Sequence, residues 1–239
     1  VVALHHYSVI DWSAKGPDVN FDEETYFKTM KESWLMEELI VKHTAIMDKY
    51  DEEKKVDLIV DEWGGWYEVS EGINPGFLYQ QNTMRDAMIA VNVLQAVILT
   101  DKEKMILTPT YHVMNMYKVH QDAKLIPLSF DSPSYNFKGE TLPALTVSAS
   151  KDLNQKVHIS FTNIDSKKNT MVAIDLNEFK LKNISGAILS SKSLHDHNSF
   201  ENPNKIAPKN FNDFKFKKGI LELTIPPFSV IVVEGAMME

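Results

Sequence analysis

Glu62 is the residue whose type and position most strongly suggest chemistry. It follows the apolar residues 58–60 and precedes two tryptophans, Trp63 and Trp66. A carboxylate at the carboxyl end of a barrel strand is typical of a catalytic group, and sugar rings stack on aromatic side chains. An acidic residue that caps a turn, with Asp61 paired to a surface base, would give the same pattern. The sequence therefore predicts sugar chemistry at Glu62 and leaves a structural role open.

His5 and Tyr7 alternate along a predicted strand, so both point to one face and His6 points to the other. On that face Tyr7 could donate a hydrogen bond to Glu62, and His5 could bind substrate hydroxyls. Two alternatives are an interior histidine held by hydrogen bonds and a metal site that includes His6. The metal site is the least favoured, because no third ligand stands at a recognised spacing.

A retaining glycosidase needs two carboxyl groups about 5–5.5 Å apart, one to attack and one to move a proton. Only Glu62 stands out as such a group. Asn177 and Glu178 resemble the Asn-Glu pair that carries the acid in many barrel glycosidases. They follow a strand of the β-rich part of the chain, so we do not expect them to act. The run from His195 to His197 fits a turn-rich loop better than a metal motif.

The first 124 residues alternate between strand and helix patterns. An apolar run predicts a buried strand at residues 1–4, and two further strands are predicted at residues 58–62 and 91–99. Helical spacing predicts helices at residues 22–49, 80–90 and 109–120. Asn20, with Glu23 three residues later, is predicted to cap the first helix. This order favours β-α-β units with a parallel sheet.

From about residue 125 the pattern changes to short β-forming runs separated by Asn, Asp, Ser, Gly and Pro. These runs lie at residues 145–147, 157–161, 171–176, 186–189, 220–225 and 229–233. They predict an antiparallel β-sandwich. We therefore expect two domains, an α/β domain at residues 1–124 and an all-β domain at residues 125–239.

Composition excludes several classes of function. The formal net charge of -8 offers no electrostatic surface for nucleic acid or an anionic membrane, so neither is expected as a partner. The absence of cysteine excludes a disulfide framework and a thiolate nucleophile, which suits a cytoplasmic location. No apolar stretch reaches the length of a membrane span.

An eight-stranded barrel takes about 250 residues, which is far more than the first 124 residues here. Three predicted strands would leave unpaired edges. We therefore expect another polypeptide segment to complete the barrel, and the chain to be a fragment.

Several segments resemble glycoside hydrolase family 51 α-L-arabinofuranosidases. They are residues 61–67 (DEWGGWY), 74–87 (NPGFLYQQNTMRDA), 91–96 (VNVLQA), 108–113 (TPTYHV) and the loop 194–203. The resemblance implies the last strands, six to eight, of a (β/α)8 TIM barrel followed by a β-sandwich. It implies retaining release of terminal α-L-arabinofuranosyl groups from arabinan, arabinoxylan and arabino-oligosaccharides, with no metal or other cofactor.

The resemblance also implies roles for individual residues. Glu62 matches the catalytic nucleophile, His5 and Tyr7 match active-site residues of strand six, and Trp66 matches an aromatic residue that lines the sugar subsite. The family's acid/base glutamate lies on strand four, upstream of the matched residues, so none is expected in this chain.

A second departure from the family lies at residues 90 and 91, where a segment with a substrate-binding glutamine is missing. Asp61 and Trp63 are expected to support the strand end. We expect the chain alone to be nearly inactive, and a homo-oligomer or the other half of the barrel to be its partner. The alternatives are a non-catalytic carbohydrate-binding or assembly module, and a related barrel glycosidase acting on xylosides or β-glucans.

Overall fold

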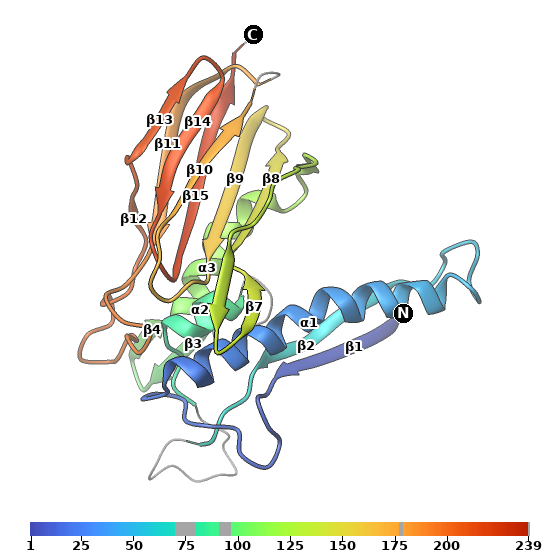
Figure 1. Cartoon of the computed structure of the whole chain (residues 1–239), viewed down its shortest axis with the longest axis vertical. Helices are drawn as coiled ribbons and strands as arrows, with labels where there is room; N and C mark the ends of the chain where they lie inside the picture. Colours follow the sequence, from blue (N-terminus) through green and yellow to red (C-terminus); the bar gives the residue numbers. More distant parts are fainter. Residues whose placement is uncertain (70–79, 91–96, 177–178, 239) are drawn as a thin grey trace.

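The computed structural model describes residues 1–69, 80–90, 97–176 and 179–238 (Figure 1). These residues form mostly β-strands with few helices. Helix α1 (Glu23–Met47) and the strands β1 (Val2–Ser8) and β2 (Leu58–Gly65) extend to one side of the molecule. Helices α2 (Met84–Ala90) and α3 (Pro109–Tyr117) lie between them and the antiparallel sheets (Figure 1). Among the described helices, none combines the length and the apolar character needed to cross a bilayer.

Strands β1 and β2 are parallel and are connected through α1, as the β-α-β pattern predicts. Their pairing runs in register up to Leu4 and Val60. It then shifts by one residue, so that His5 lies opposite Glu62 rather than Asp61. Irregularities of this kind re-aim side chains at strand ends. The shift brings His5 and Glu62 to the same level.

The N-terminal cap of α1 is Asp22, whose side chain accepts a hydrogen bond from the Thr25 amide at 2.8 Å. The prediction that Asn20 caps this helix is wrong. Asn20 has a φ of 53° and lies two residues before the cap Asp22, and Glu23 occupies the first helical position. The predicted extent, 22–49, agrees closely with the observed helix.

Burial in α1 is concentrated in its first half. Tyr26, Phe27 and Met30 are buried, whereas Val41 and Ile46 in the second half are 62% and 53% exposed. The helix is therefore held at the end nearest the antiparallel sheets.

The predicted third parallel strand at residues 91–99 is corrected for the part that is described. Residues 91–96, and the junction at residues 90 and 91, lie outside the described residues. Strand β3 (Ile98–Asp101) pairs with β4 (Lys104–Leu107) in an antiparallel hairpin. An apolar run predicts a strand but does not determine its partner.

Two antiparallel sheets contain most of the remaining strands. One has the order β12-β11-β15-β9-β8-β5, and the other has the order β10-β14-β13. Their bounds are β5 (Lys124–Leu125), β8 (Leu145–Lys151), β9 (Lys156–Asn163), β10 (Thr170–Asp175), β11 (Leu181–Leu189), β12 (Lys209–Asn210), β13 (Phe214–Lys217), β14 (Ile220–Ile225) and β15 (Ser229–Met237). The predicted runs fall in these strands, except that the run 171–176 extends one residue past β10, and the short strands β5, β12 and β13 were not predicted.

Both antiparallel sheets contribute to one apolar cluster. Phe161 and Ile231 of the six-stranded sheet are buried together with Leu221 and Leu223 of the three-stranded sheet. A second cluster joins α1, α2 and α3 to the hairpin of β6 (Ser134–Phe137) and β7 (Glu140–Pro143). These two clusters supply most of the buried apolar surface that stabilises the fold.

The expectation that residues 1–4 form a buried strand is wrong for two side chains, because Val1 and Val2 are 81% and 40% exposed. In the neighbouring strand β2, Ile59 is 44% exposed. In the described part of the chain β1 pairs only with β2, and α1 packs against this pair, so much of the two-stranded sheet remains uncovered.

Candidate active site

The carboxylate of Glu62 lies next to two side chains from β1. The hydroxyl of Tyr7 donates a hydrogen bond to Glu62 Oε2 at 2.8 Å, and His5 Nδ1 lies 3.4 Å from the same oxygen. His5 Nε2 lies 3.0 Å from Asp61 Oδ1. The structure therefore brings together three of the four residues that the sequence singled out, at the carboxyl ends of neighbouring parallel strands.

This group is open to solvent. The side chains of Glu62 and His5 are 55% and 47% exposed. The pKa of the Tyr7 hydroxyl is raised, first because it donates to Glu62, and further by partial burial and the negative charge of Glu62. Tyr7 therefore stays protonated at neutral pH and orients one carboxylate oxygen. The carboxylate can attack an electrophile that approaches from solvent.

His6 lies on the other face of β1, as strand alternation predicts. Its Nε2 is 2.9 Å from the carbonyl oxygen of Glu32 in α1, so it holds the strand against the helix. Throughout the ranges that the structure describes, no group of three His, Asp or Glu side chains could hold a metal ion.

Trp66 forms an aromatic wall beside the Tyr7–Glu62 pair. Its ring packs edge to face against Tyr7, with the ring centres 5.2 Å apart. Trp12 packs edge to face against Trp66, with the two ring centres 5.7 Å apart. The Lys15 ammonium lies 5.6 Å from the centre of the Trp66 ring. Such a surface suits the apolar face of a sugar.

Sequence reasoning missed Trp12 and Lys15. Trp12 is 63% exposed and stands between Asp11 and Ser13, which form a local turn through the Asp11 carboxylate. A tryptophan between two polar residues, in the connection that follows a predicted strand, was the available signal. What the sequence could not give is its distance from Trp66, because 54 positions separate the two along the chain.

Asp61 and Trp63 lie beside Glu62 with different surroundings. Asp61 is half-exposed and contacts His5, whereas Trp63 is partly buried and packs against the apolar cluster around α2 and α3. These contacts suit the supporting roles expected of both residues.

A buried arginine lies behind the aromatic wall. Arg85 is fully buried, with its Cζ 3.5 Å from the ring centre of Tyr67 and 3.9 Å from that of Phe21. Asp86 accepts hydrogen bonds from the Tyr67 hydroxyl at 2.9 Å and from the Thr83 amide at 2.7 Å. Burial raises the pKa of the Asp86 carboxyl, and the charge of Arg85 opposes that rise. Sequence reasoning did not identify this cluster.

The loop with His195 and His197 is structural, as the sequence favours. His195 Nε2 lies 2.7 Å from the carbonyl oxygen of Phe21, and the two rings pack edge to face. Asp196 binds Lys205 and Ser191. The Asn177-Glu178 pair lies outside the described residues.

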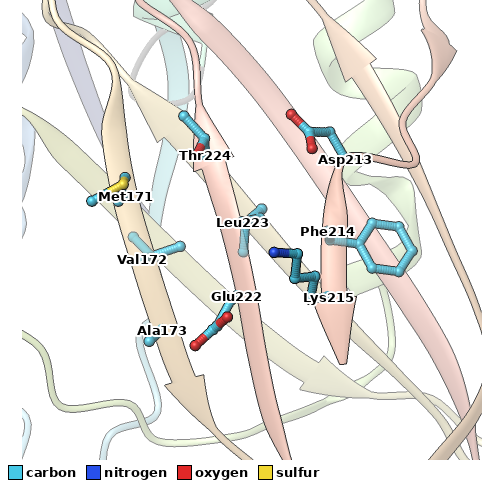
Figure 2. Close-up of a pocket in the computed structure, with 9 residues that line it drawn as sticks. All are labelled: Met171, Val172, Ala173, Asp213, Phe214, Lys215, Glu222, Leu223 and Thr224. Carbon is cyan, nitrogen blue, oxygen red and sulfur yellow. The ribbon is translucent and has the colours of Figure 1, made fainter. Parts of the chain in front are cut away.

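The outer face of the three-stranded sheet carries a hollow of about 450 Å³, far from Glu62 in the chain. Figure 2 shows Lys215 and Glu222 near its centre and Met171 on the strand at one side, while the ring of Phe214 points away from them. Met171 is 83% exposed, and no aromatic ring faces the centre of the hollow in this view. The hollow therefore lacks the stacking platform that a sugar-binding module uses.

Comparison with known proteins agrees with this geometry. A family model for the α-L-arabinofuranosidase C-terminal domain matches residues 89–229. An intracellular exo-α-L-arabinofuranosidase of Bacteroides ovatus is 38% identical over 98% of this chain and 50% of its own length. The crystal structure of a GH51 arabinofuranosidase from Xanthomonas axonopodis pv. citri has a TM-score of 0.93 and 36% identity, over 98% of this chain and 52% of that one.

An α-L-arabinofuranosidase from Thermotoga maritima, crystallised as an arabinose complex, has the same fold, with a TM-score of 0.78 at 22% identity over 97% of this chain and 52% of that one. The chain thus spans about half the length of the relatives it matches. The family model covers more than half of the chain, and the similar proteins share one enzyme family. The chain belongs to glycoside hydrolase family 51 and matches the C-terminal part of the family's α-L-arabinofuranosidases.

Proposed function

We propose that this chain supplies the nucleophile, Glu62, to a retaining α-L-arabinofuranosidase. The observation that carries the proposal is the hydrogen bond of 2.8 Å from Tyr7 to Glu62 at the carboxyl ends of two parallel strands. A carboxylate that is oriented by one donor and open on its other side is suited to attack an anomeric carbon.

In the proposed reaction Glu62 displaces the leaving group and forms a covalent arabinofuranosyl ester. Tyr7 holds the attacking carboxylate, His5 binds substrate hydroxyls, and Trp66 with Trp12 supports the sugar face. A second carboxyl group must protonate the leaving oxygen and later activate water. We place this acid/base in the half of the matched relatives that this chain does not cover.

The same proposal assigns the domains. Residues 1–124 would form the last part of a (β/α)8 barrel, supported by the parallel pair β1–β2 and its connection through α1. Residues 125–239 would form the β-sandwich, supported by the apolar cluster that both antiparallel sheets share. The uncovered edges of β1 and β2 would pair with the other barrel strands or lie in an oligomer.

Arabinan, arabinoxylan and arabino-oligosaccharides are the proposed substrates. The similar protein of Bacteroides ovatus bears an exo-α-L-arabinofuranosidase name, and the Thermotoga maritima structure is an arabinose complex. The similar protein of Bacteroides ovatus is also described as intracellular, which supports a cytoplasmic location for the present protein.

Replacement of the nucleophile tests the proposal. In a polypeptide that contains both halves, Glu62→Gln should lower kcat on an aryl α-L-arabinofuranoside by about 10⁴-fold or more, as loss of a covalent nucleophile does. Glu68→Gln, which alters an exposed acid six residues later, is the matched control. Residues 1–239 alone should be slower than the complete enzyme by at least about 10²-fold, because the acid/base is missing.

Azide adds a stereochemical readout. In Glu62→Ala, azide can enter the space of the lost carboxylate and attack from the same side. It should restore turnover and give the β-arabinofuranosyl azide, whereas an enzyme with a different nucleophile would give no such product. Wild-type rates in Glu62→Gln would contradict the proposal. Calorimetric binding of arabino-oligosaccharides that survives both Glu62→Gln and Trp66→Ala would place recognition elsewhere in the chain.

A further inference from the structure

Arg85 is the only arginine among 239 residues, in a chain that has 24 lysines. It is fully buried, and its guanidinium lies within 4 Å of the ring centres of both Phe21 and Tyr67. Two rings cannot occupy one face of a planar ion at such distances, so the guanidinium lies between them. A desolvated cation between aromatic faces is held more strongly than an exposed one.

The donors of Arg85 hold the segment that connects β1 to α1. Its two terminal nitrogens donate to the carbonyl oxygen of Pro17 at 3.3 Å, and Nη2 also donates to that of Asp18 at 2.9 Å. Trp12 and Lys15 belong to the same segment. One further backbone hydrogen bond, from the Glu68 amide to the Gly16 carbonyl at 2.9 Å, connects it to the segment after β2.

The stacking partner Tyr67 connects Arg85 to the candidate site. Tyr67 is the residue after Trp66, and it is 2% exposed while Trp66 is only partly buried. Arg85 covers its ring, Asp86 accepts from its hydroxyl, and the Gln80 side chain accepts from its amide. Tyr67 is therefore fixed at its ring, its hydroxyl and its backbone, which leaves Trp66 little freedom.

We propose that Arg85 is a positioning residue that fixes Trp12 and Trp66 relative to each other, and thereby forms the sugar-stacking wall beside Glu62. The hydrogen bonds of Arg85 fix the position of the segment that carries Trp12, and its stacking contact fixes Tyr67, the residue next to Trp66. The two rings meet at 5.7 Å although they come from separate connections. The role in sugar binding depends on the function proposed above, whereas the fixed arrangement of the two rings does not.

The chemistry of the contacts explains why an arginine stands here. A guanidinium is planar, stacks on both faces and donates in a fixed fork, whereas a lysine ammonium is a point charge on a flexible stem. Lysine at position 85 would keep the charge next to Asp86 but would lose the stack and the fork. Arg85→Lys is therefore a specific test of the geometry.

The test uses fluorine NMR of the 239-residue chain labelled with 5-fluorotryptophan. The four tryptophans, Trp12, Trp34, Trp63 and Trp66, give four lines, which single Trp→Phe variants assign. In Arg85→Lys the lines of Trp12 and Trp66 should shift or broaden. The line of Trp34 in α1 should stay in place and serves as an internal reference.

Two further variants keep the result interpretable. Phe21→Leu removes one stacking face and leaves the hydrogen bonds of Arg85, so it should move the same two lines by less. Phe161→Leu lowers stability by weakening the core of the antiparallel sheets. Because that core is separate from the contacts of Arg85, the variant should leave all four lines unchanged. If Arg85→Lys does not fold, Phe21→Leu decides the outcome. Unchanged lines of Trp12 and Trp66, or equal movement of all four, would overturn the proposal.

A titration with an arabino-oligosaccharide separates this inference from the proposed function. The Trp66 line of the wild-type chain should shift on binding, and Arg85→Lys should bind about tenfold more weakly, as misplaced contacts do. In the complete enzyme the same variant should raise KM more than it lowers kcat. If the free lines respond to Arg85→Lys and the complete enzyme binds no arabino-oligosaccharide, the positioning role stands and the proposed function fails. If the lines of Trp12 and Trp66 do not respond to Arg85→Lys, the positioning role fails, whether or not the sugar binds.

Discussion

The parallel pair β1–β2 and the antiparallel pair β9–β15 are packed in opposite ways. Residues 157–163 of β9 are all buried, and so are residues 229–233 of β15. In β1 and β2 the buried residues are Leu4, Ser8, Gly64 and Gly65. The candidate catalytic residues lie in the poorly covered pair.

This contrast separates stability from chemistry. Dense packing in the antiparallel sheets removes apolar area from water, which is the main favourable term in folding. The half-exposed carboxylate of Glu62 and ring of His5 contribute little to that term and remain accessible to a ligand. Natural proteins depart from core patterning at functional sites. The exposed ends of β1 and β2 are therefore consistent with a functional site. The exposed apolar residues of these strands are consistent with a surface that another element covers.

Truncating one apolar residue in each region gives the largest expected difference. Phe161→Ala should lower the free energy of unfolding by about 3–5 kcal/mol, because the ring is fully buried between the sheets. Ile59→Ala should change it by less than about 0.5 kcal/mol, because that side chain is 44% exposed. Urea unfolding followed by circular dichroism measures both. An equally large loss for Ile59→Ala would show that β2 is covered in solution, and the contrast between the two pairs would disappear.

Tyr7→Phe tests the other side of the comparison, because it should affect chemistry without affecting stability. A hydrogen bond to a charged group contributes about 1.5–3 kcal/mol, so kcat/KM of the complete enzyme should fall about 10- to 150-fold. The free energy of unfolding of the chain should change by less than about 0.5 kcal/mol, because Glu62 remains solvated.

Tyr50→Phe is the control for that variant, since it removes the same hydroxyl from a side chain that is 86% exposed. It should alter neither activity nor stability. If Tyr7→Phe lowered stability and left kcat/KM unchanged, Tyr7 would be a structural residue and the separation of roles between the regions would be lost.

The sequence predicted the residues at the candidate site better than the residues that surround and support them. Strand alternation placed His5 and Tyr7 on one face, and the structure brings both to Glu62. The resemblance to glycoside hydrolase family 51 is confirmed by the comparisons. Trp12 and the partners of Arg85 were not predicted, because their contacts join residues far apart in sequence and no local pattern encodes such distances.

Errors in the fold have a similar cause. The apolar residues 98–99 were assigned to a parallel strand and instead belong to the β3–β4 hairpin, since strand partners depend on tertiary context. Asn20 and Asp22 are both acceptable helix caps, and the choice of Asp22 depends on where the preceding segment enters α1. Burial of β1 was predicted from its apolar composition, which does not reveal how many strands and helices are present to cover it.

The smallest expected effect concerns pH and distinguishes the two regions by titration. Both ring nitrogens of His120 lie within 2.7 Å of serine hydroxyls, Ser150 of β8 and Ser160 of β9. Burial, and then the nearby His158, lower the pKa of His120 from its usual 6.5. Below about pH 6.5 the unfolded chain therefore binds a proton that His120 in the folded chain does not bind. The free energy of unfolding falls by at most about 1.4 kcal/mol for each pH unit of acidification because of this group.

His120→Asn should reduce the slope of the free energy of unfolding against pH between pH 5 and 7. Ser150→Ala, which keeps the imidazole, should lower stability and leave the slope. An unchanged slope in His120→Asn would show that the antiparallel sheets do not set the pH dependence of stability.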